Sequence, residues 1–183
     1  VCSSDLMLQR ASKILDQRCH QVSGGTFHGF GNVLLRRYAT ELGFEPNFTI
    51  LDRSDSEDII QSLRKELGYP KLDKRFPKKG TIQSIISKCI NTQKSLLSII
   101  EKDYPQFVEF SEDIHKIQEA YIAQKMAMQV MDYDDLLVQV VMLLRENPHI
   151  REELQNQYQY IMVDEYQDTN AIQSEVISYL VNA

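Results

Sequence analysis

The chain has 183 residues, 43% of them hydrophobic and 9% aromatic, which is enough for the packed core of one domain and argues against global disorder. Its formal net charge of −6 argues against a protein that coats nucleic acid with bulk positive charge, but leaves room for a groove with a few local cations. The three cysteines form no C-x-x-C pair and the four histidines show no metal-ligand spacing, so neither a disulfide framework nor a zinc site is predicted. Because no apolar run approaches about 18 residues and no signal-peptide pattern opens the chain, we expect a cytoplasmic protein that does not enter a membrane.

The first third of the sequence predicts two helices, a short strand and a third helix. The first helix covers residues 6–21, and the second begins at Thr26 after a Gly-Gly break. Residues 48–51 are a short strand candidate. A capping box at residues 54–57 predicts the start of the third helix, which ends at Gly68.

The middle of the chain is helical in pattern, after a basic segment at residues 71–80 that Pro70 and Pro77 mark as a loop. From residue 81 to residue 131 the pattern is helical throughout, with one stripe of apolar residues three and four apart at residues 107–121. A further helix covers residues 132–146 and ends at Asn147-Pro148. A short helix follows it.

An apolar run at residues 160–164 ends in two adjacent acids, Asp164 and Glu165, followed by a polar turn and a last helix. Such a run without polar alternation is typical of a strand buried on both faces in a parallel sheet. Ligands of open α/β sheets bind at the carboxyl ends of strands, where one acid can hold Mg²⁺ through water and the other can activate an attacking water. The alternative is an acidic strand-to-helix turn in which Asp168 or Thr169 caps the next helix.

Seven consecutive residues of this segment resemble the Walker B motif of the UvrD/Rep/PcrA helicases of superfamily 1. The matching residues are Asp164-Glu165-Tyr166-Gln167-Asp168-Thr169-Asn170. The resemblance implies that Asp164 holds the Mg²⁺ shell of a bound ATP and that Glu165 is the general base for the attacking water. It also implies that Gln167 and Asp168 link the nucleotide site to the DNA-binding parts.

A second segment, Thr26-Phe27-His28, resembles the Thr-Phe-His-Ser motif of the same helicases, which lies on the path of single-stranded DNA. Gly29 takes the place of the serine, so the hydroxyl contact of that position is missing. From the residues alone, the helix start can meet a phosphate and Phe27 or His28 can stack on a base. The alternative is that Phe27 is a core residue and His28 its polar neighbour.

A third segment, residues 131–137, resembles the Asp-aromatic-Asp-Asp-Leu segment where the family's chain re-enters its first motor domain from an inserted helical domain. Asp132 or Asp134 can cap the following helix, and this structural role suffices to explain the pattern without catalysis. Strand candidates thus lie on both sides of a helical block. This order predicts an α/β fold with a helical insertion. The resemblance implies a partial RecA-like P-loop NTPase domain, in residues 1–55 and 131–183, with an all-helical insertion at residues 56–130.

The basic segment concentrates positive charge. Its five cations are Lys71, Lys74, Arg75, Lys78 and Lys79. A solvated loop is the structural interpretation, whereas the resemblance implies an inserted domain that helps to contact duplex DNA. The loss of one phosphate contact would reduce the slope of log affinity against log salt concentration by about one.

The resemblance implies an ATP-dependent DNA helicase that moves on single-stranded DNA, three-prime to five-prime, and separates duplexes. No G-x-x-x-x-G-K-[ST] phosphate loop occurs in this sequence. We therefore expect an internal fragment that is marginally stable, has an unpaired apolar strand edge and binds Mg-ATP weakly or not at all by itself. Two alternatives are a non-catalytic module that binds DNA or a partner, and a metal-dependent nuclease with Asp164, Glu165 and Asp168 as ligands.

Overall fold

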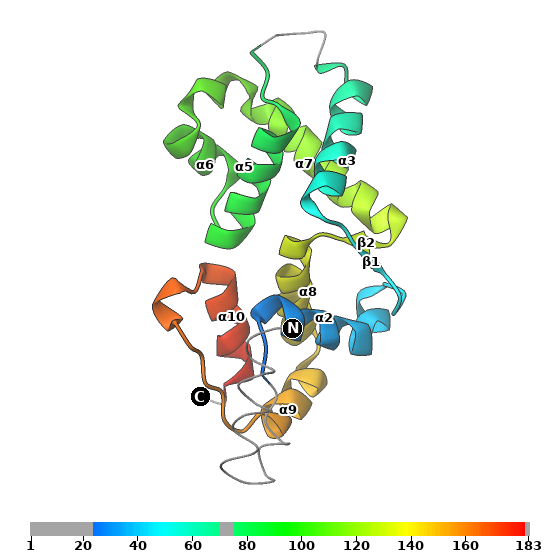
Figure 1. Ribbon diagram of the computed structural model, residues 1–183, viewed down its shortest axis with the longest axis vertical. Coiled ribbons are helices and arrows are strands. Elements are labelled where there is room, and N and C mark those ends of the chain that lie inside the picture. Colours follow the sequence, from blue (N-terminus) through cyan, green and yellow to red (C-terminus); the bar gives the residue numbers. More distant parts are fainter. Residues whose placement is uncertain (1–23, 70–74, 182–183) are drawn as a thin grey trace.

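The computed structural model describes residues 24–69 and 75–181, and this part of the chain is mostly helical with a short pair of strands. The elements are, in order, α2 (Phe27–Tyr38), η2 (Ala39–Leu42), β1 (Thr49–Ile50), α3 (Arg53–Glu66), α5 (Lys79–Thr92), α6 (Leu96–Asp103), η3 (Pro105–Phe110), α7 (Ser111–Met128), β2 (Val130–Met131), α8 (Tyr133–Glu146), α9 (Pro148–Gln157), η4 (Tyr166–Asp168) and α10 (Ala171–Leu180). Figure 1 shows two helical groups: the α8 group (α2, α8, α9, α10) and the α5 group (α3, α5, α6, α7), with β1 and β2 between them. The first predicted helix, residues 6–21, lies outside the described residues.

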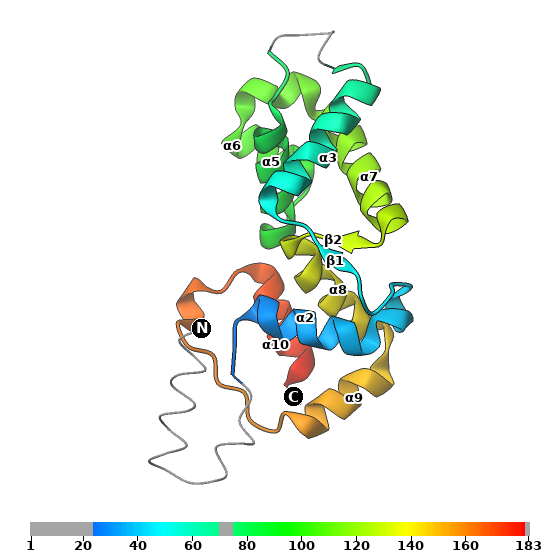
Figure 2. The ribbon, with the colours of Figure 1, turned by 45° about the vertical axis from the view of Figure 1, so that its right-hand side comes forward.

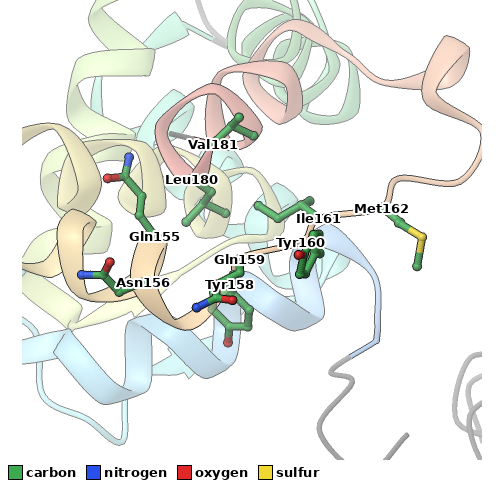
Figure 3. Close-up of a pocket in the computed structure, with 9 residues that line it drawn as sticks. All are labelled: Gln155, Asn156, Tyr158, Gln159, Tyr160, Ile161, Met162, Leu180 and Val181. Carbon is green, nitrogen blue, oxygen red and sulfur yellow. The ribbon is translucent and has the colours of Figure 1, made fainter. Parts of the chain in front are cut away.

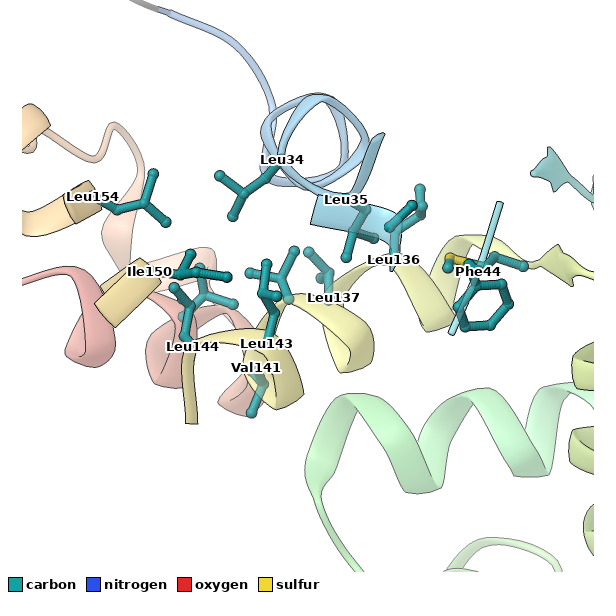
Figure 4. Packing of buried hydrophobic residues seen from close by; sticks show 14 of the residues in the cluster. Leu34, Leu35, Phe44, Leu136, Leu137, Val141, Leu143, Leu144, Ile150 and Leu154 are labelled. Atoms are coloured by element: carbon teal, nitrogen blue, oxygen red, sulfur yellow. The ribbon is translucent and has the colours of Figure 1, made fainter. Parts of the chain in front are cut away.

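Helix α8 is the central helix of the α8 group. Its apolar face is buried, as the spacing of apolar residues at 132–146 predicts. Its buried side chains are Leu136, Leu137, Val140, Val141, Leu143 and Leu144. Leu34 and Leu35 of α2 point toward α8 from one side (Figure 4), and Gly31 permits this approach, since a Cβ there would meet Val140 Cγ2 at 3.4 Å. Full burial of one such aliphatic side chain contributes about 1.5–3 kcal/mol, so this packing holds α2 and α10 in place around α8.

The α5 group has a hydrophobic cluster of its own. Ile114, Ile117 and Tyr121 lie on one face of α7, and all three are buried, as the stripe at residues 107–121 predicts. Phe107 and Phe110 pack against the cluster but are only partly buried. The two helical groups therefore each have a core, and they meet around the strands and the ends of α5, α7 and α8.

β1 and β2 form a parallel pair, in which Thr49 lies opposite Val130 and Ile50 opposite Met131. The backbone N–H of Leu51 donates to the carbonyl of Met131 at 2.8 Å and extends the pairing. The strand candidate at residues 48–51 is thus confirmed. The prediction that residues 81–131 are helical throughout is wrong at residues 93–95 and 104, where the chain turns between helices, and at its end. There α7 stops at Met128, and residues 130–131 pair with a strand that lies far away in the sequence.

Side-chain caps begin both α2 and α3. Thr26 Oγ1 accepts a hydrogen bond from the Gly29 N–H at 3.1 Å and begins α2, as predicted. The predicted capping box at residues 54–57 is wrong, because Asp52 caps α3 and accepts from the Asp55 N–H at 2.8 Å. An acid two residues ahead of the serine takes the capping role and begins the helix earlier.

The joint between the two groups contains a buried charge cluster that sequence reasoning missed. Lys125 Nζ, near the end of α7, lies 2.7 Å from Asp132 Oδ2 and 2.6 Å from Asp135 Oδ2. Tyr121 Oη donates to Asp132 Oδ2 at 2.8 Å. Asp132 and Asp135 also form the capping box that begins α8, so the predicted capping role of Asp132 is confirmed, and the same carboxylates hold Lys125.

Candidate functional site

The apolar segment ahead of the two acids is extended but unpaired. Residues 158–163 belong to no strand, and the side chains of Tyr160 and Met162 are 91% and 93% exposed. A groove lies along this segment, lined by Tyr158, Ile161 and Leu180 among others (Figure 3). The prediction of a strand at residues 160–164 that is buried on both faces is therefore wrong for this chain. A central strand needs a hydrogen-bonded neighbour on each side, and no described segment pairs with this one.

Asp164 and Glu165 lie in a turn directly after this extended segment, and both are exposed. Asp164 Oδ1 accepts a hydrogen bond from the Glu165 N–H at 3.0 Å. Glu165 has a left-handed backbone, with φ 50° and ψ 43°, which is a strained conformation for a residue other than glycine. Gln167 Nε2 donates to the Glu165 carboxylate. Both carboxylates thus face solvent, where their oxygen atoms can hold a hydrated Mg²⁺ or accept a proton from water.

Short-range hydrogen bonds connect the acids to α10. The Asp168 N–H donates to the Glu165 carbonyl at 2.9 Å, and Thr169 Oγ1 donates to the Tyr166 carbonyl at 2.7 Å. The helix begins at Asn170, whose side chain accepts from the Gln173 N–H at 2.9 Å within a capping box. The predicted capping of this helix by Asp168 or Thr169 is therefore wrong, although the predicted start of the last helix is confirmed.

The acids of this turn do not assemble a metal site of the nuclease type. In residues 24–69 and 75–181, no group of three or more His, Cys, Asp or Glu side chains lies close enough to hold a metal ion. Asp164, Glu165 and Asp168 accordingly do not form such a group. The nuclease interpretation has no support from this geometry.

Thr26, Phe27 and His28 differ in what their side chains do. The Thr26 hydroxyl caps α2, and Phe27 packs partly buried against the core of the α8 group. His28 is half-buried, and its ring centroid lies 5.8 Å from that of Tyr133 in an edge-to-face arrangement. Tyr133 is 58% exposed. The structure thus joins the second and third matching segments through two aromatic rings.

The sequence analysis did not identify Tyr133 as a candidate functional residue. The acids on either side of it, Asp132 and Asp134, already explained the segment as a helix cap. The available signal was the aromatic residue itself, at the first position of an amphipathic helix whose apolar face begins three residues later at Leu136. An aromatic side chain there faces away from the helix core.

The basic segment is partly tied to the α5 group. Lys79 belongs to α5 and lies 2.6 Å from Asp58 of α3, and Arg75 pairs with Glu109 at 3.3 Å. The predicted loop at residues 71–80 therefore ends before Lys79. Lys78 is exposed, whereas Lys71 and Lys74 lie outside the described residues. These pairs favour the structural interpretation for Lys79 and Arg75.

Comparison with known proteins gives one consistent family. The model of the UvrD/REP helicase N-terminal domain matches residues 3–183. The chain is 29% identical over 176 residues to the ATP-dependent DNA helicase PcrA of Staphylococcus aureus (strain NCTC 8325 / PS 47), which covers 96% of this chain and 23% of that protein. It is 30% identical over 177 residues to the ATP-dependent DNA helicase PcrA of Staphylococcus epidermidis (strain ATCC 12228 / FDA PCI 1200), with the same coverage of 96% and 23%. The chain thus spans less than a quarter of the length of these relatives. None of the helices that the structure describes is both long and apolar enough to cross a membrane.

Proposed function

Because the chain belongs to the UvrD/REP helicase N-terminal domain family, we propose that it is part of a longer ATP-dependent DNA helicase. In that protein, ATP hydrolysis drives movement along single-stranded DNA, three-prime to five-prime, and separation of the duplex. The observation that carries the proposal is the run of seven motif residues at 164–170, inside a family match that extends over residues 3–183.

The proposed organisation has two parts of a RecA-like motor domain, residues 1–55 and 131–183, around an inserted helical domain at residues 56–130. Two features support it. The α5 group has a core separate from that of the α8 group, and β1 and β2 pair in parallel where the chain leaves and returns. The exposed apolar segment at residues 160–163 is the part that further strands of the longer protein would bury.

In the proposed ATP site, Asp164 holds the hydrated Mg²⁺ and Glu165 accepts the proton of the attacking water. The residues fit these roles because both carboxylates are exposed and consecutive, and neither forms an ion pair with a cation of the described residues, so their oxygen atoms are open to a hydrated divalent ion. Mg²⁺ supplies charge neutralisation on the phosphates when it is bound. Gln167 holds the Glu165 carboxylate through its amide and thereby orients the general base. The chain itself has no phosphate loop, so we expect weak binding of Mg-ATP without the rest of the protein.

The proposed contact with single-stranded DNA is the start of α2, at Thr26, Phe27 and His28. The half-exposed His28 and its neighbour Tyr133 offer aromatic faces for bases, and the first backbone N–H groups of α2 offer donors to a phosphate. Phe27 supports this surface from beneath, since it packs on the core. Duplex DNA is the second proposed nucleic-acid partner, on the side of the inserted domain.

The test is ATP hydrolysis by the longer protein with and without single-stranded DNA, after its gene has been read upstream of the codon for Val1. A Gly-Lys-Ser/Thr phosphate loop upstream, together with DNA-stimulated hydrolysis, is the expected result. An intact reading frame without that loop, and DNA binding without hydrolysis, would instead indicate a non-catalytic binding module.

A further inference from the structure

Three polar side chains from separate parts of the chain form one line of hydrogen bonds across the joint between the helical groups. Asn170 Nδ2, at the start of α10, donates to Asn91 Oδ1, near the end of α5, at 2.6 Å. Asn91 Nδ2 donates in turn to Asp134 Oδ1, in the first turn of α8, at 2.8 Å. All three side chains are partly buried, so water competes only weakly for these bonds.

The direction of this line is fixed at both ends. Asn170 Oδ1 is already used, because it accepts from the Gln173 N–H and caps α10, so the amide NH₂ of Asn170 must point toward Asn91. Asp134 is an acceptor only when ionised, so Asn91 must present its own NH₂ to it. Asn91 is further held within α5 by a hydrogen bond from its Nδ2 to the Ser87 carbonyl at 2.9 Å. The central amide therefore has one favourable orientation.

A displacement at Asn170 reaches the acids through few bonds. Thr169 and Asp168 are hydrogen-bonded back to Tyr166 and Glu165, so residues 165–170 form one short, internally bonded turn. A second bond, from Gln93 Nε2 to the Glu175 carboxylate, also ties the end of α5 to α10. The position of α5 is thus linked to that of Asp164 and Glu165.

We propose that Asn91 is a positioning residue, which fixes the turn at residues 164–170 relative to the α5 group and transmits movements of that group to the two acids. This inference rests on the proposed function only for the role of the acids. The positional link itself is a property of this chain and can be measured without ATP.

Four variants of the chain isolate the link. Asn91→Asp places a carboxylate opposite Asp134, and the repulsion moves the side chain at position 91 away from both Asp134 and Asn170. Asp134→Asn alone keeps an oxygen that accepts from Asn91. In the double variant Asn91→Asp/Asp134→Asn, the new amide at position 134 donates to the new carboxylate at position 91, which reverses that bond, while the carboxylate still accepts from the Asn170 amide. Asn170→Ser keeps the capping oxygen of α10 but removes the donor to Asn91.

The readout is amide hydrogen exchange in this chain, compared between residues 164–176 and α6. A lost hydrogen bond of ordinary strength should speed exchange in residues 164–176 by about fivefold in Asn91→Asp and Asn170→Ser, with α6 unchanged. The double variant and Asp134→Asn should return to within about twofold of the wild type. Equal acceleration in α6, no local change, or a double variant as fast as Asn91→Asp would each overturn the positional link. Should Asn91→Asp fail to fold, Asn170→Ser carries the same test.

ATP hydrolysis by the longer protein separates this inference from the proposed function. We expect Asn91→Asp to lower kcat severalfold with little change in the KM for ATP, and the double variant to recover. A wild-type protein that hydrolyses no ATP would contradict the proposed function and leave the exchange result standing. Unchanged kcat in Asn91→Asp, together with normal wild-type hydrolysis, would overturn the transmission to the acids alone.

Discussion

Lys125 Nζ lies 2.7 Å from Asp132 Oδ2 inside the joint between the two helical groups, where the side chains are only 5% and 10% exposed. Asp135 is the second acceptor of the same ammonium group. Removing one charge of a buried pair leaves the other charge buried without a partner. This loss of stability is larger than the net stabilisation that the intact pair provides. The cluster therefore makes the junction of α7 and α8 sensitive to any single charge change.

We predict that Lys125→Met lowers the free energy of unfolding by about 3–5 kcal/mol, because two buried carboxylates lose their cation. Urea denaturation followed by circular dichroism measures this. Lys116→Met is the matched control, since Lys116 pairs with Asp113 at 3.4 Å on the surface, and such pairs contribute about 0–1 kcal/mol. Equal losses in the two variants would contradict the importance of the buried cluster.

Stability should also depend on pH through Asp135. Burial, and next the neighbouring Asp132, raise the pKa of Asp135 from 3.8 to about 6. Burial by itself would raise the pKa of Asp132 too, but Lys125 and the hydrogen bonds around it outweigh this and lower it. The stabilisation from Asp135 is fully present below the unfolded-state pKa near 3.8 and is lost as the pH rises through about 6. The stabilisation from Asp132 is present above pH 3.8 and is lost only as the pH falls below that value.

We therefore expect the contribution of Asp135 to fall between pH 5 and pH 7 by an amount on the order of 1 kcal/mol. The neutral side chain of Asp135→Asn should remove this part of the pH dependence. Urea midpoints of the wild type and the variant at both pH values give the difference, with the exposed Glu152→Gln as a control. A variant whose pH dependence equals that of the wild type would show that Asp135 is not the group responsible.

The exposed apolar segment should make the isolated chain associate. Tyr160 and Met162 are almost fully exposed on an extended, unpaired backbone, and unpaired edges of this kind add strands from other molecules. We predict that the double variant Tyr160→Lys/Met162→Lys stays monomeric at concentrations at which the wild type forms larger species, as measured by light scattering. Val33→Lys, at an exposed valine of α2, should change little. If it suppresses association equally, general surface charge and not this segment is the cause.

His28 and Tyr133 contact each other through their rings, and the proposed stacking of bases on these rings can be tested with His28→Ala and Tyr133→Ala. Each should weaken binding of single-stranded DNA by the longer protein by about 1–3 kcal/mol, the usual contribution of one stacked base. Fluorescence anisotropy at several salt concentrations measures this. The slope of log affinity against log salt should not change, because no phosphate contact is lost. An altered slope, or unchanged affinity in both variants, would argue that these rings lie off the DNA path.

Local signals predicted the helices well, because capping and amphipathic spacing act over a few residues. The start of α2 at Thr26 and the buried face of α8 follow directly from such patterns. Pairing partners are not local, so the sequence pattern missed β2 and predicted a buried strand at residues 160–164, where the structure has an unpaired segment. An apolar run shows that a segment is suited to burial, but other segments must be present to bury it.

At the candidate site, the sequence predicted the turn that follows the apolar run, but it did not predict the contacts of the side chains around it. The acids at 164 and 165 lie exposed in a turn, as their sequence position after an apolar run suggests. Neither the link from Asn170 to Asn91 nor the contact of His28 with Tyr133 could be read from spacing, since each depends on how the two helical groups meet. A lysine four residues after Tyr121 on the buried face of α7 was an available sign of the charge cluster.

The most direct test of the account is the turnover of ATP by the longer protein carrying Glu165→Gln, at saturating single-stranded DNA. Without its general base, hydrolysis should fall by about 10²–10⁴, while ATP binding, measured separately by equilibrium titration, stays close to that of the wild type. The exposed Glu152→Gln should leave both unchanged. Turnover that survives Glu165→Gln intact would contradict the assignment of this segment as the catalytic carboxylate of a helicase motor.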